Sequence, residues 1–146
     1  MPQYAPSALL YNNCVEASDT DEKTMIADYM EKGFLDNIID MFKHNPALYE
    51  YTGDLLKDER FRVRIGAAAL IETLAKEDPS NISRAIPSMI RLLNAQSATL
   101  RGDAVYLLGI TGSISVIPFL KQALNDEEAE VRALAKEALE EIGATP

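Results

Sequence analysis

The amino-acid sequence predicts an all-α fold in which about four pairs of helices stack into an α–α solenoid. Three observations predict it: a ten-residue segment that recurs three times, helical apolar spacing after the copies, and an ordinary globular composition. The chain has 146 residues, of which 47% are hydrophobic and 25% charged. No apolar run approaches the ~20 residues that a membrane-spanning helix needs, so we expect no membrane partner.

The recurring segment reads LLKDERFRVR, LLNAQSATLR and ALNDEEAEVR, at residues 55–64, 92–101 and 123–132. Each copy ends in an aliphatic residue followed by arginine. After Val131, and again after Val63, apolar residues follow at offsets of 4, 7, 8 and 11, which is the spacing of one helix face. An Ile-Pro pair precedes two of the copies, and proline suits the first turn of a helix. Each unit is therefore predicted to be a helix, a short turn and a second helix.

The predicted elements follow one another in four pairs. The first pair, residues 19–45, is a degenerate cap in which Gly33 stops one helix and Asn45-Pro46 ends the next. Repeats are expected at about 46–76, 79–111 and 113–143, and the eight helices at 19–32, 34–44, 46–57, 60–76, 82–94, 98–110, 115–124 and 127–142. Residues 1–18 show no helical period, so we expect an amino-terminal arm, held by packing, before a single domain of residues 19–146.

The segment LGITGSISVIPFLKQALNDEEAEVRALAKEALEEIG, Leu108 to Gly143, resembles a HEAT repeat of the short kind found in the phycobilin-lyase-like group. That family's pattern is L-G-x-I-G-D-x-x-A-I-P-x-L, then L-x-D-x-x-x-x-V-R, then a helix ending in L-G-x-I-G. The resemblance covers residues 46–143 and implies a right-handed superhelix. It also implies that a turn aspartate and the arginine six residues later tie units together; the matching residues are Asp58 with Arg64 and Asp126 with Arg132, whereas Ala95 breaks the pattern before Arg101.

The residues that carry most enzyme and metal chemistry are scarce. With one cysteine and one histidine, the chain lacks the usual zinc ligands, and it lacks the several His-Glu pairs of the iron hydroxylase built from HEAT repeats. We expect His44 to end a helix and Cys14 to be an inert thiol. Glu127, Glu128 and Glu130 are expected to mark a helix start rather than a metal site. The prediction is no enzyme, no catalytic residue, no metal and no cofactor.

The charge of the chain argues for a protein partner. The formal net charge is −9, from 23 acidic and 14 basic residues, which opposes binding to phosphate backbones and anionic lipid. We therefore expect no nucleic-acid partner, in contrast to the DNA glycosylases built from HEAT-like helices, which need a basic face. The first residues lack the pattern of a secretory signal, which predicts a cytoplasmic location.

The predicted partner-binding surface is the concave face lined by the second helices. Offsets of 2, 6 and 9 from each aliphatic residue point away from the core and give the candidate residues: Ile65, Ala69 and Glu72; Gly102, Tyr106 and Gly109; Ala133, Glu137 and Glu140. Two glycines around Tyr106 suggest that another chain approaches its ring closely. Two interpretations stay open at this stage: a groove that binds a peptide or helix, and a groove that residues 1–18 fill.

The sequence thus predicts a non-enzymatic protein–protein interaction module, or scaffold, that binds a partner on the concave face around Tyr106. The alternative is a phycobilin-lyase-like chromophore-attachment protein, or a subunit of one, as the resemblance implies. A purely structural subunit is the third interpretation.

Overall fold

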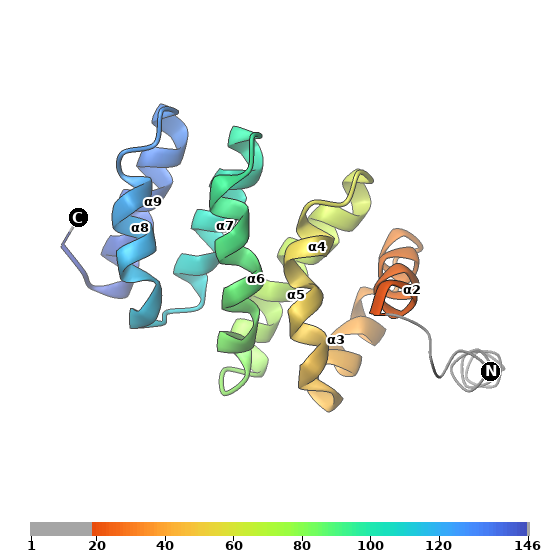
Figure 1. The fold of residues 1–146 in the computed structure, drawn as a ribbon. Coiled ribbons are helices and arrows are strands. Elements are labelled where there is room, and N and C mark those ends of the chain that lie inside the picture. The colour runs from red at the N-terminus through yellow and green to blue at the C-terminus, as the bar shows by residue number, and fades with distance from the viewer. Residues whose placement is uncertain (1–18, 146) are drawn as a thin grey trace, which may run out of the picture.

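The chain folds into pairs of helices that stand side by side in sequence order, from α2 and α3 at one end to α8 and α9 at the other (Figure 1). The computed structural model describes residues 19–145; the expected arm of residues 1–18, with Cys14, lies outside the described residues. The α-helices are α2 (Asp19–Glu31), α3 (Leu35–His44), α4 (Thr52–Leu56), α5 (Phe61–Glu77), α6 (Ile86–Ile90), α7 (Ala98–Ile110), α8 (Ile117–Ala123) and α9 (Ala129–Ile142). Residues 19–145 contain no strand, so the predicted all-α solenoid is confirmed.

The first helix of each repeat is not the continuous α-helix that the sequence predicts. Each combines a short α-helix with 3₁₀ segments, which are η1 (Pro46–Tyr51), η2 (Ile82–Ala85), η3 (Arg91–Asn94) and η4 (Ile114–Val116). Prolines stand at the start of η1 and within the first two positions of α6 and α8. Because proline has no N–H to donate, the α-helical ladder begins anew at these residues and the flanking turns tighten to 3₁₀ geometry.

The second helices α5, α7 and α9 build the core, as their periodicity predicts. They begin and end within two residues of the expected ranges. Leu70, Leu107 and Leu139, which lie on the core faces of successive second helices, are each fully buried. The most extensive packing between any two elements of the described chain joins α7 to α9. The second helices therefore make most of the packing between the second and third repeats, whereas the first helices make most of it between the first and second.

A small buried polar cluster joins the first helices of the first and second repeats. The Ser88 hydroxyl oxygen accepts a hydrogen bond from the backbone N–H of Gly53 (3.0 Å) and lies 2.8 Å from the hydroxyl oxygen of Thr52. The Thr52 hydroxyl donates to the carbonyl oxygen of Tyr49 (2.9 Å). Since Thr52 and Ser88 are both buried, these bonds satisfy groups that water does not reach.

Replacing Ser88 with alanine is expected to lower the free energy of unfolding by about 1–3 kcal/mol, because the buried N–H of Gly53 loses its acceptor. Urea denaturation followed by circular dichroism measures the change. Ser83→Ala, at an exposed serine of η2, is the matched control and should change stability by about 0.5 kcal/mol or less. Equal losses in the two variants would contradict the role assigned to the cluster.

Candidate partner-binding surface

The predicted site residues divide into two groups once the helices are packed. Seven of the nine remain exposed or partly exposed on α5, α7 and α9: Ile65, Ala69, Glu72, Tyr106, Ala133, Glu137 and Glu140. The other two, Gly102 and Gly109, are buried. We call the accessible surface of α5, α7 and α9 the second-helix face.

The two glycines on α7 serve contacts within the chain, which corrects the expectation that they open the Tyr106 ring to a partner. A Cβ atom on Gly109 would lie 2.7 Å from the Cβ and 3.2 Å from the Cα of Ala138, and one on Gly102 would lie 3.1 Å from a methyl carbon of Leu134. Ala138 and Leu134 both belong to α9. Helix α9 approaches so closely that only glycine fits at residue 109 without a shift of backbone. The chain that approaches these glycines is therefore α9 of the next repeat, not a partner.

Tyr106 has a polar partner on the neighbouring repeat. Its hydroxyl donates a hydrogen bond of 2.6 Å to the Oε2 atom of Glu72, which joins α7 to α5. The bond to this carboxylate, followed by partial burial, raises the pKa of the Tyr106 hydroxyl above its usual range. The hydroxyl therefore stays protonated at neutral pH, and the bond restricts the orientation of an otherwise exposed ring.

Two large apolar residues belong to the second-helix face although the sequence pattern did not select them. Phe61 precedes Ile65 by one helical turn on α5, and Ile110 follows Tyr106 by one turn on α7. The exposed fractions are 68% for Phe61, 55% for Ile65, 42% for Tyr106 and 36% for Ile110. The offsets of 2, 6 and 9 miss Phe61 because they begin one turn after it, and they miss Ile110 because the third offset selects Gly109, the residue before it. Extending the same periodicity by four residues finds them.

The α9 part of this surface is acidic. Glu137 and Glu140 are exposed, as are Glu130 and Glu141 on the same helix. Glu137 and Glu140 make neither a side-chain hydrogen bond nor an ion pair with any other residue of the described chain. Helix α9 thus adds negative charge that residues 19–145 leave uncompensated.

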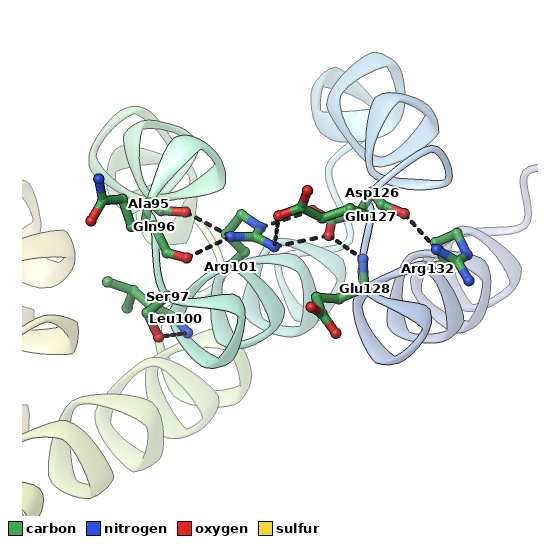
Figure 2. A network of polar contacts seen from close by, with 9 residues as sticks. All are labelled: Ala95, Gln96, Ser97, Leu100, Arg101, Asp126, Glu127, Glu128 and Arg132. Carbon is green, nitrogen blue, oxygen red and sulfur yellow. Dashed lines mark hydrogen bonds and ion pairs between the residues drawn. The ribbon is translucent and has the colours of Figure 1, made fainter.

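The arginine that ends each recurring segment binds the turn before it, as Figure 2 shows for Arg101 and Arg132. The Nη1 atom of Arg101 donates to the carbonyl oxygens of Ala95 and Gln96, both at 2.9 Å. Arg64 makes the same two bonds in its own turn, and Arg132 makes one, to the carbonyl oxygen of Asp126. These carbonyls lie in the turns that follow the first helices, and the arginines give them hydrogen-bond donors.

The turn aspartate Asp126 pairs with the arginine of the preceding repeat and so ties two units together, as the resemblance implies, whereas Asp58 pairs with Arg60 in its own turn. Asp126 accepts from Nε and Nη2 of Arg101 at 2.8 and 3.0 Å, a two-pronged ion pair whose side chains are only 10–12% exposed. Its Oδ1 atom also accepts the N–H of Glu128 (2.9 Å), so the acidic run stands at the turn before α9, as expected. Ala95 has no carboxylate for Arg64, so the expected ladder is interrupted there.

Acidification is expected to weaken the fold partly through this pair. Hydrogen bonds from Arg101 and from the N–H of Glu128 lower the pKa of Asp126 in the folded state. The stabilisation is therefore present above the unfolded pKa of about 4 and is lost as the pH falls through the lower folded value. Urea unfolding at a series of pH values between 7 and 2 should show this loss. Asp126→Asn should reduce the slope of the free energy of unfolding against pH. Parallel pH profiles of the unaltered protein and Asp126→Asn would contradict the role assigned to this ion pair.

Charged groups at one cavity of the described chain, and its histidine, make contacts within the fold. A cavity of about 450 Å³ between α2 and the α4–α5 turn is lined by charged residues that already pair: Lys23 with Asp54 at 3.2 Å, and Arg60 with Asp58 at 3.0 Å. The Nδ1 atom of His44, the last residue of α3, lies 2.8 Å from the carbonyl oxygen of Asp40. Among the described residues, no three His, Cys, Asp or Glu side chains cluster as a metal site would require, and no helix is long and apolar enough to cross a membrane.

Comparison with families of known proteins matches residues 49–140 to HEAT repeats. This match begins in η1 and ends near the carboxyl end of α9, so it includes all three arginine-bearing turns. No curated protein matches the chain.

Proposed function

This chain belongs to the HEAT repeat family, and on that premise we propose that it is a non-enzymatic module that binds a partner protein on its second-helix face. HEAT repeats generally mediate protein–protein interaction, and the family is typically non-enzymatic. The net charge of −9 supports a protein as the partner rather than a nucleic acid.

The observation that carries this proposal is which helices bear the exposed apolar side chains. Six large hydrophobic residues of the described chain are exposed, and four of them, Phe61, Ile65, Tyr106 and Ile110, lie on α5 and α7. The other two, Phe34 and Ile114, lie at the turns before α3 and at the start of η4. Apolar side chains concentrated on one surface, with polar residues beside them, are typical of protein-binding sites.

Two features of Tyr106 support a role as a binding anchor. Its ring is exposed while its hydroxyl is held by Glu72, so little conformational freedom remains to be lost when a partner covers the ring. Tyrosine is among the residues whose truncation most often costs an interface 2 kcal/mol or more. We therefore place Tyr106 at the centre of the binding surface, as the concave-face hypothesis proposes.

Ile65→Asp and Tyr106→Ala are expected to weaken partner capture by about tenfold or more, because each removes an apolar contact at the proposed anchor positions. The measurement is quantitative mass spectrometry of proteins captured from the cells that produce this chain. Ile114→Asp is the matched control, since Ile114 is even more exposed, at 78%, yet lies outside the second-helix face.

The captured set should lose the same proteins in both second-helix variants and keep them in the Ile114→Asp control. Melting temperatures close to that of the unaltered protein show that all three variants remain folded. Retention of an unchanged set by both Ile65→Asp and Tyr106→Ala would overturn the proposed function. No observation on residues 19–145 favours the chromophore-attachment alternative, so we do not propose it.

A further inference from the structure

We propose that the partner segment is a basic amphipathic helix, with apolar side chains seated on α5 and α7 and lysines or arginines facing α9. This inference rests on the proposed function and names the class of partner that the second-helix face fits. It follows from three observations. The charge of the surface is unevenly distributed, its helices carry no amide side chain, and residues 1–18, the alternative occupant, have no basic residue.

Charge changes from one helix of the surface to the next. The exposed residues Phe61, Ile65, Tyr106 and Ile110 make the α5 and α7 part apolar, whereas Glu137 and Glu140 make the α9 part acidic. A partner that covers all three helices would bury uncompensated carboxylates unless it brings positive charge to α9. Complementary charge on the partner is therefore required at α9 and not at α5.

The basic residues of α9 do not neutralise this acidic part. Leu134 and Ala138 lie against the glycines of α7, which fixes the side of α9 that faces the preceding repeat. Helical spacing then puts Arg132 and Lys136 on the flank that turns away from α7, while Glu137 and Glu140 stay between the two flanks. No ion pair joins either of these bases to an acid of the described chain.

The side chains of the surface favour a helical partner over an extended one. Helices α5, α7 and α9 contain neither asparagine nor glutamine, so the surface has no amide side chain to pair with a bound backbone. An extended peptide would bury backbone N–H and C=O groups without partners there, which is costly. A helix satisfies those groups internally and presents only side chains.

The length of this helix follows from the packing of the solenoid. Neighbouring packed helices lie about 8–10 Å apart, so the span from α5 to α9 is roughly 20 Å. At 1.5 Å per residue, a helix crosses this span in about 13 residues. The apolar and basic residues of the partner should therefore occupy opposite halves of a segment of about four turns.

The amino-terminal arm does not have this chemistry. Residues 1–18 contain no lysine or arginine and carry one glutamate. If the arm covered the second-helix face, Glu137 and Glu140 would remain uncompensated. A second copy of the chain, with a net charge of −9, also fits poorly. The occupant with matching charge is a separate basic segment.

Fluorescence anisotropy with two labelled synthetic helices tests this proposal on the full chain. The first probe has 16 residues, with leucines at helical spacing in one half and four lysines in the other; the second carries glutamates in place of the lysines. We expect the lysine probe to bind at least tenfold more tightly than the glutamate probe. We also expect its affinity to fall as salt is raised, since exposed charges are screened. Equal binding of the two probes would overturn the proposal.

Charge reversal locates the contact. The double variant Glu137→Lys with Glu140→Lys should weaken binding of the lysine probe at least tenfold. The control, Asp36→Lys with Glu50→Lys, changes the net charge equally on exposed residues of α3 and η1, and should weaken binding less than threefold. Equal losses in the two double variants would mean that net charge alone attracts the probe, and would overturn the inference.

Two further measurements distinguish a failure of this inference from a failure of the proposed function, and test whether residues 1–18 occupy the surface. If capture of native partners depends on Ile65 but is unaffected by the reversal at Glu137 and Glu140, the function stands and the basic helix is wrong. If capture does not depend on Ile65, the function itself fails. Leu9→Asp with Leu10→Asp in the full chain should leave probe affinity unchanged; a tenfold gain would show that the arm is the occupant, against our proposal.

Discussion

Replacing Leu107 with alanine is expected to lower the free energy of unfolding by about 2–5 kcal/mol. Leu107 is fully buried on α7, which packs against both α5 and α9. Truncation leaves a cavity in the core beside α7, and the closely packed interior has little freedom to collapse into it. The whole stability of a small domain is about 5–15 kcal/mol, so this loss is a large part of it.

Urea denaturation measures the effect of Leu107→Ala. The dependence of the free energy of unfolding on urea concentration should stay unchanged, which would show that the two-state transition is retained. Ile110→Ala, on the same helix but partly exposed, is the control and should cost less than half as much. A loss below about 1 kcal/mol for Leu107→Ala would mean that Leu107 is not packed as the structure has it.

Replacing Gly53 with alanine is expected to destabilise the protein by about 1–3 kcal/mol or more, because a methyl group there meets backbone. A Cβ atom on Gly53 would lie 2.6 Å from the carbonyl oxygen and 2.9 Å from the carbonyl carbon of Ser88. These atoms belong to α6, so the first helices of two repeats would have to separate. The hydrogen bond from the N–H of Gly53 to the Ser88 hydroxyl would lengthen at the same time.

Gly66→Ala is the matched control for Gly53→Ala, since a Cβ atom on Gly66 also meets a neighbour. That neighbour is the Met30 side chain, through its Sδ and Cγ atoms, which is buried but more adaptable than backbone. Alanine also favours a helix over glycine by up to about 1 kcal/mol, so Gly66→Ala should cost clearly less than Gly53→Ala. Similar destabilisation by both changes in thermal unfolding would contradict the distinction between backbone and side-chain neighbours.

The sequence predicts the helices and their core positions well because both depend on local periodicity. Ala67, Leu70 and Leu74 on α5, like Ala135 and Leu139 on α9, are buried where offsets from the aliphatic residue place them. The same rule correctly leaves Ile65 and Tyr106 accessible. It fails for the first helices, whose prolines fit the start of a helix but also break it into 3₁₀ and α segments.

Tertiary structure decides which neighbour meets each position, and periodicity contains no information about this. Offsets place Gly102 and Gly109 on the same side of α7 as Tyr106, but only the packed repeats show that α9 covers the glycines. In the same way, Asp126 stands six residues before Arg132 yet pairs with Arg101, 25 residues away. The angle of a residue around its own helix is a local property, whereas the distance between two helices depends on every side chain between them. The sequence by itself therefore determined the repeat and its buried stripe, and the contacts that join one repeat to the next were decided by packing.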